Sequence, residues 1–290
     1  MNPMNPVLKK ELKTSMRTWR MPAMITVYTL LLAGLLLIVF MESFSSYQYY
    51  RGFRPSSLQG MYFAITILQL VLIGVIVPST TASGISGEKQ RRTFDLLICT
   101  RLSSISIVLG KLWAALSKMV LLLIVSIPII SMISLFGGVD LYNILLLYGF
   151  YMITAILFGS IGLFTSSIFK RTVTAIIVSG LVILFLSIGT FIIVGLWYEF
   201  HGYKMTSTGI VSLLYMNPFS GLSAILDYQF GESLDLFRNL GVKGSVLKPM
   251  YLNMSFDLIV SCILLYLTSL RINPMKQFKF RLRKKDEKNA

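Results

Sequence analysis

Long apolar runs separated by short charged segments dominate the pattern of hydrophobic and polar positions along the chain. A helix that crosses the hydrocarbon core of a bilayer needs about 20 apolar residues, because each residue rises ~1.5 Å and the core is ~30 Å thick. The runs predict six membrane-spanning helices, at about residues 21–41, 61–82, 112–136, 142–167, 173–197 and 251–270. The last run is the weakest because Asp257 interrupts it. We therefore expect an all-α integral membrane protein with a single transmembrane domain over residues 1–290.

The composition supports this interpretation and adds an orientation. Of the residues, 55% are hydrophobic and 13% are charged, whereas soluble domains carry about 25% charged residues. The net charge of +15 raises the question of nucleic acid, but the basic residues flank the predicted spans, which is typical of topology determinants and contacts with anionic lipid. Most of them fall on one side of the six spans, which predicts cytoplasmic termini, a basic cytoplasmic tail at 271–290 and a plasma-membrane location.

The segment before the first span predicts an interfacial helix at residues 5–20. Leu8, Leu12, Met16 and Trp19 share one helical face, and basic residues occupy the opposite face. Such a helix lies in the membrane interface with its apolar side in the acyl boundary. It acts either as an anchor only or as a lever that also touches a cytoplasmic partner, and the sequence favours neither alternative.

The predicted cytoplasmic loop at 83–110 contains both charged residues and regularly spaced apolar residues. Phe94, Leu97 and Ile98 follow a helical spacing inside a charged frame. A short amphipathic helix here would suit docking into a groove on another protein. The alternative is a solvated loop rich in Lys and Arg, which does not explain the regular apolar positions.

Two further features concern packing and the opposite side of the membrane. Ala155, Gly159, Gly162 and Ser166 form a stripe of small residues, which predicts close contact with another helix, within the chain or across a dimer. The extracellular segment 199–249 holds two apolar pieces too short to span, around Asn217 and Pro218. They form either a lid over an exit path or a folded outer loop.

Several kinds of chemistry are missing from the sequence. It contains no G-x-x-x-x-G-K-[ST] segment, so the usual cradle for nucleotide phosphates is absent, and no H-E-x-x-H or G-x-S-x-G motif occurs. We assign no catalytic residue, cofactor or metal site, and His201 has no clustered ligands around it. Only Lys118 and Asp257 lie inside predicted spans as formal charges, and Asp257 is a candidate residue of a transport path, or else lies near a span end.

The loop between the second and third predicted spans has a recognisable pattern. Residues 88–97 read E-K-Q-R-R-T-F-D-L-L and are followed by Thr100, Ser103, Gly110 and Lys111. This resembles the cytoplasmic segment of ABC-2 type ABC transporter permeases, E-x-x-x-G-T-L-E-x-L-L, then T-P-x-S, then G-K. Arg92 replaces the usual glycine, and Arg101 replaces the usual proline.

The resemblance implies an exporter fold in which two permease chains, identical or homologous, associate with cytosolic ABC ATPase subunits that bind ATP and magnesium. It also implies that this loop carries the element in contact with the ATPase. The expected contact residues are Glu88, Lys89, Arg91, Arg92, Thr93, Phe94, Asp95 and Leu97.

The leading hypothesis is therefore a non-catalytic permease subunit that exports a hydrophobic or amphipathic substrate, such as a peptide, lipid or drug. One alternative is a transport-inactive anchor or sensor that recruits a cytosolic partner through the same loop. The other is an ion-coupled carrier. Nucleic acid is not an expected partner, whereas membrane lipid is.

Overall fold

The computed structural model describes residues 19–50, 55–94, 103–137, 139–201, 212–231 and 248–272, and all regular elements within these ranges are helices. In chain order they are α2 (Arg20–Tyr50), α3 (Pro55–Gln90), α5 (Ser104–Gly137), α6 (Leu141–Ile168), α7 (Thr172–Leu184), η1 (Phe185–Gly189), α8 (Thr190–His201), η2 (Ser212–Met216), α10 (Pro218–Phe230) and α12 (Lys248–Ile272). The all-α fold class is confirmed. Most of the predicted interfacial helix, residues 5–18, lies outside the described residues.

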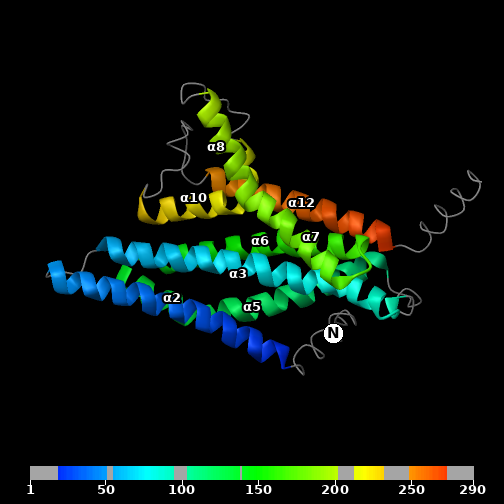
Figure 1. The fold of residues 1–290 in the computed structure, drawn as a ribbon, viewed down its shortest axis with the longest axis horizontal. Coiled ribbons are helices and arrows are strands. Elements are labelled where there is room, and N and C mark those ends of the chain that lie inside the picture. Colours follow the sequence, from blue (N-terminus) through cyan, green and yellow to red (C-terminus); the bar gives the residue numbers. More distant parts are fainter. Residues whose placement is uncertain are drawn as a thin grey trace, which may run out of the picture.

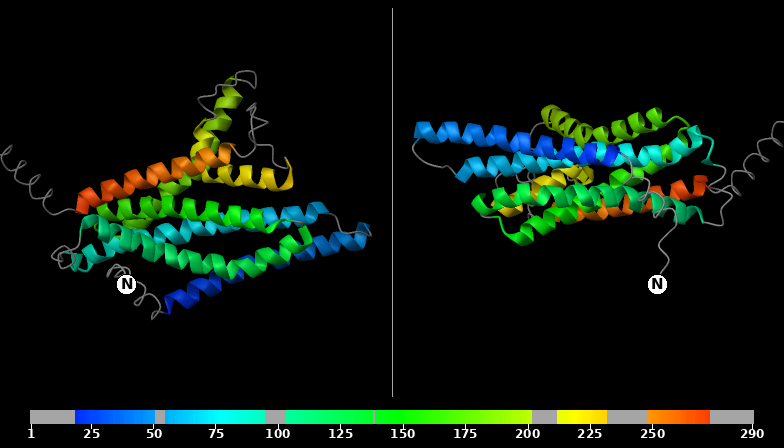
Figure 2. Two further views of the ribbon diagram at one scale, coloured as in Figure 1. Left: turned by 180° about the vertical axis from the view of Figure 1, so that it is seen from behind. Right: turned by 90° about the horizontal axis from the view of Figure 1, so that it is seen from below.

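Six helical segments of the described chain are long and apolar enough to cross a membrane. They begin at Met21, Gln59, Ser104, Leu141, Thr172 and Pro249, close to the predicted spans. Helices suit this environment because every backbone N–H and C=O inside a helix is paired within the segment, whereas hydrocarbon offers no alternative partner. The long helices run side by side and successive spans alternate in direction (Figures 1 and 2).

The helices at the end of the second span and the start of the third are longer than expected. A loop was expected from residue 83 to residue 110, but α3 continues to Gln90 and α5 begins at Ser104. The 36 residues of α3 extend roughly 54 Å, well beyond the ~30 Å hydrocarbon core. The apolar pattern covered only part of this helix, so it did not predict where α3 ends.

Helix α6 lies at the centre of the bundle. Its side chains Leu147, Phe150, Tyr151 and Phe158 are buried, and it packs against α3, α5, α7 and α12. Burial on several sides follows from its composition, because α6 carries apolar or small residues around its whole circumference. The helix therefore contacts most of the other spans and forms much of the core of the bundle.

The small-residue stripe of α6 faces α3 within the same chain. A Cβ atom added at Gly162 would overlap the Thr81 hydroxyl and lie 3.1 Å from the Pro78 carbonyl oxygen. One turn further on, the Ser166 hydroxyl accepts the backbone N–H groups of Ile85 (3.0 Å) and Ser86 (2.7 Å). The predicted helix contact is confirmed, and it is intramolecular.

The fifth span is bent where the π-helix η1 separates α7 from α8, and α8 leaves the bundle (Figure 1). Asn217 stabilises this bend. Its side-chain N–H donates to the Ser187 carbonyl oxygen and to the Thr190 hydroxyl, both at 2.7 Å. Its Oδ1 atom accepts the Phe219 N–H and so caps α10, with Pro218 in the first helical turn. The two short apolar pieces of the 199–249 segment are helical where the structure describes them, in η2 and α10.

Candidate functional site

The basic end of the bundle is defined here as the end where α3 and α6 terminate and α5 and α7 begin. Arg91, Arg92, Lys170 and Arg171 are exposed there. This end also contains residues 88–94, the last residues of α3 and the turn that follows them, which include all six described residues expected to contact a partner. We call this segment the turn after α3 and treat it as the candidate site.

Three consecutive residues connect the last turn of α3 to three other helices. Glu88 forms an ion pair with Lys111 of α5, with 2.8 Å between Oε1 and Nζ. Lys89 donates from Nζ to the backbone carbonyl oxygens of Ser166 (3.4 Å) and Ser167 at the end of α6. The Gln90 side-chain oxygen accepts the Thr172 hydroxyl at 2.8 Å, at the start of α7. A displacement of this turn therefore acts on α3, α5, α6 and α7 together.

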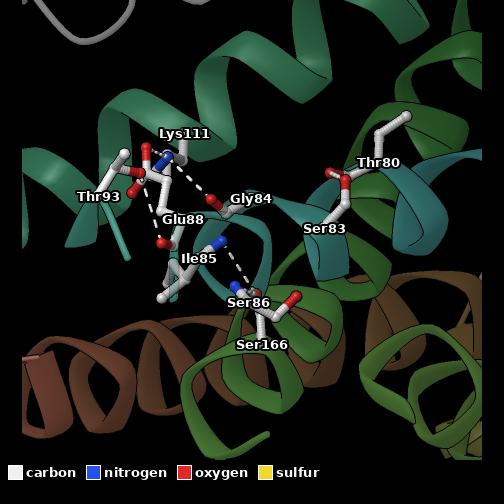
Figure 3. Close-up of polar contacts among 9 residues, drawn as sticks. All are labelled: Thr80, Ser83, Gly84, Ile85, Ser86, Glu88, Thr93, Lys111 and Ser166. Carbon is white, nitrogen blue, oxygen red and sulfur yellow. Dashed lines mark hydrogen bonds and ion pairs between the residues drawn. The ribbon is translucent and has the colours of Figure 1, made fainter. Parts of the chain in front are cut away.

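The Glu88–Lys111 pair joins α3 to α5 (Figure 3) and is largely buried. Only 3% of the Lys111 side chain and 20% of the Glu88 side chain are exposed. Lys111 also donates to the Gly84 carbonyl oxygen at 3.1 Å. Glu88 is the first residue of the sequence pattern and Lys111 is its last. Their ion pair holds the end of α3 against the start of α5.

Helix α3 ends in a left-handed turn whose central residue is Arg92, with φ of 58°. The Arg92 N–H donates to the Lys89 carbonyl oxygen, and the Thr93 N–H donates to the Glu88 carbonyl oxygen. These two bonds define a Schellman motif, in which the left-handed position is usually glycine. The ABC-2 permease pattern that the sequence resembles also has glycine at this position. The backbone therefore keeps the left-handed turn although Arg92 replaces the glycine.

Replacing Arg92 with glycine should raise the stability of the fold by about 0.5–1 kcal/mol, because the Cβ atom is disfavoured at positive φ. Thermal unfolding of the purified protein, followed by circular dichroism, measures the change as a higher Tm. Arg91 precedes the left-handed position, and Arg91→Gly is the matched control. If both glycine variants raise the Tm, or if both lower it, the positive φ at residue 92 is not the cause of the change in stability.

The eight expected contact residues have different locations. Glu88 and Lys89 point into the bundle, whereas Arg91, Arg92 and Thr93 are exposed. Phe94 is partly buried, with its ring centroid 5.6 Å from the Lys89 ammonium group. Asp95 and Leu97 lie outside the described residues. Sequence reasoning missed the inward orientation of Glu88 and Lys89, and only the pairing of an acidic and a basic residue in the pattern could have indicated it.

Asp257 lies away from this site, between α12 and α6. It is fully buried, and the Thr154 hydroxyl donates to its Oδ2 atom at 3.4 Å, whereas Oδ1 has no hydrogen-bond partner among the described residues. Helix α12 begins at Lys248 and continues through this position, so Asp257 does not mark a span end. A role in a transport path stays a prediction.

The described residues hold no group of three or more His, Cys, Asp or Glu side chains that could bind a metal ion. A comparison with protein families gives one match: the model of a family described as ABC-2 family transporter protein matches residues 40–270. The match covers the spans from the end of α2 to near the end of α12 and includes the candidate site. A comparison with curated proteins found no match.

Proposed function

The chain belongs to the ABC-2 family of transporter proteins, which are membrane-spanning permease components of ABC transporters, and from this premise we propose that it is the permease of an ATP-driven exporter. Its ATPase is a separate cytosolic subunit, where ATP and magnesium bind. The permease forms the path for a hydrophobic or amphipathic substrate, and a second permease chain, identical or homologous, completes the membrane part.

One observation supports this proposal most strongly: the turn after α3 is exposed on one side and connected to the bundle on the other. Arg91, Arg92 and Thr93 are accessible to a partner, whereas Glu88, Lys89 and Gln90 contact three further helices. A surface with this arrangement transfers a force applied from outside to the spans. A membrane anchor would need the exposed side only.

The proposed mechanism follows from this arrangement. The excess of Lys and Arg at the basic end supports a cytoplasmic location for that end, with both termini on the same side of the plasma membrane. ATP binding closes the ATPase subunits, and their movement displaces the turn after α3. Because the turn is bonded to α5, α6 and α7, these helices move as a group and the path opens alternately to the two sides.

We expect the tagged full-length chain, purified from native membranes in mild detergent, to retain a stoichiometric subunit with a P-loop. Arg91→Glu should reduce the amount of this subunit about tenfold or more, because it reverses a charge at the proposed contact. Mass spectrometry and quantitative gel analysis measure the retained subunit.

Arg171→Glu is the control, because Arg171 is also exposed at the basic end but lies on the turn before α7. It should retain the partner. Equal losses in the two variants would contradict the assignment of the turn after α3 as the contact. Reproducible absence of a P-loop subunit from the unmodified, folded chain would contradict the proposed function itself.

A further inference from the structure

A cavity of about 400 Å³ lies between α3 and the fifth span. Residues 70–79 of α3 form one wall, and residues 176–188 of α7 and η1 form the other. Phe158 of α6 and Phe219 of α10 complete the lining. This volume falls within the ~300–1,000 Å³ range of pockets that bind small molecules. The cavity lies apart from the turn after α3 and from Asp257.

Among the described residues of the lining, none has a charged side chain, and only Ser79 and Ser187 carry hydroxyl groups. The Ser79 hydroxyl donates within its own helix, to the Val75 carbonyl oxygen. Transfer of an ionised group into such surroundings is costly, because no counter-charge replaces the lost water. The cavity therefore selects for uncharged, largely apolar ligands.

Both long walls have an irregular backbone, and the α3 wall provides a hydrogen-bond acceptor. Pro78 lies inside α3 and has no N–H, so the Gly74 carbonyl group loses the donor that the residue four positions later normally supplies. Gly74 and Pro78 both line the cavity. On the facing wall, η1 is a π-helix, an irregularity often found at functional sites. A ligand hydroxyl or amide N–H can pair with the Gly74 carbonyl oxygen.

We infer that this cavity binds an uncharged, mainly hydrocarbon molecule that carries one hydrogen-bond donor, and that this is the chemical class the permease exports. The binding part stands on the cavity alone, whereas the export part rests on the proposed function. A long-chain alcohol has this chemistry, and so does a membrane lipid with a single free hydroxyl group. The two sources are distinguished below.

The chain offers a matched pair of variants for the test. A Cβ atom added at Gly180, in the cavity wall, meets no other atom within 4 Å, so a side chain can extend from this position into the cavity. A Cβ atom added at Gly195 of α8 also meets nothing within 4 Å, but Gly195 does not line the cavity. Gly180→Trp and Gly195→Trp therefore add the same bulk, and only the first occupies the binding space.

The probe is a photoactivatable dodecanol with a diazirine group in its chain, added to the full-length protein in lipid nanodiscs without ATP. We expect label on peptides from residues 70–79 and 176–188 by mass spectrometry. Gly180→Trp should lower this labelling about tenfold, a loss of ~1.4 kcal/mol in binding free energy, and Gly195→Trp should leave it unchanged. Equal labelling of the two variants, both with an unchanged Tm, would overturn the inference.

Competition tests the charge requirement. Unlabelled dodecanol should displace the probe, whereas dodecyltrimethylammonium, which has the same chain and a fixed charge, should not. Equal displacement by both would overturn the uncharged class. Because this labelling needs neither ATP nor a partner, its failure is distinguishable from failure of the ATPase pulldown.

Addition of ATP to the complex with the copurified ATPase tests the export part. Loss of the cavity label after ATP addition supports an exported molecule. Retention of the label under active ATP hydrolysis overturns the export part and assigns the cavity to a resident membrane lipid.

Discussion

Gly162→Ala should greatly reduce the yield of folded protein, because α3 cannot keep its position against α6 with a methyl group at this site. The added Cβ atom would overlap the Thr81 hydroxyl and approach the Pro78 carbonyl oxygen to 3.1 Å. The second obstacle is backbone and cannot rotate away. We expect a loss of about 2–3 kcal/mol, typical of overpacking at a close helix contact.

Two other glycines of α6 give a graded control. A Cβ atom at Gly149 meets nothing within 4 Å, so Gly149→Ala should be neutral or slightly stabilising. At Gly159 the obstacle is Cδ1 of Leu112, at 2.8 Å, which belongs to a side chain that can rotate. Gly159→Ala should therefore fall between the other two. Thermal unfolding and size-exclusion profiles rank the three variants, and a Gly162→Ala protein as stable as Gly149→Ala would refute the close α3–α6 contact.

Lys111→Met should destabilise the basic end by about 2 kcal/mol. It removes the partner of Glu88 Oε1, whereas Oε2 has none in the described part of the chain, and it removes the donor to the Gly84 carbonyl oxygen. Breaking a fully buried pair from one side costs about 3–5 kcal/mol. The expected loss is smaller because a fifth of the Glu88 side chain, 20%, still contacts solvent.

The double variant Glu88→Gln/Lys111→Met separates charge from shape. It removes both charges and retains most of the side-chain volume, so it should recover most of the Tm lost by Lys111→Met alone. A double variant with a Tm as low as that of the single one would show that the Lys111 contacts with α3, rather than the uncompensated Glu88 charge, determine the loss. Copurification of the ATPase, measured on the same samples, reports whether the turn still supports the partner.

The spans could be predicted from the sequence because the bilayer imposes a strong, one-dimensional constraint. An uncharged run of about 20 residues has few stable alternatives to a crossing helix. The stripe at Gly159 and Gly162 also predicted a contact, because small residues permit close backbone approach in lipid. The helix facing the stripe was not predictable, because the complementary surface on α3, around Pro78 and Thr81, has no comparable pattern.

The location of the candidate site along the sequence stays a prediction, and the directions of its side chains were not predictable. Glu88 and Lys89 resemble solvated loop residues in composition, whereas α3 continues past them and turns both toward the bundle. Their partners, Lys111 and Ser167, lie on other helices. Arg92 illustrates a different limit, because its positive φ is imposed by the hydrogen bonds of the Schellman turn and not by its own preference.

Asn217 also joins three parts of the chain that are distant in sequence. Its partner Ser187 precedes it by 30 residues, and Asn253, which donates to its carbonyl oxygen, follows it by 36. The bend of the fifth span therefore depends on residues that the ribosome adds after the span itself. A chain truncated before residue 217 lacks these hydrogen bonds, so its fifth span would have to keep the bend without them.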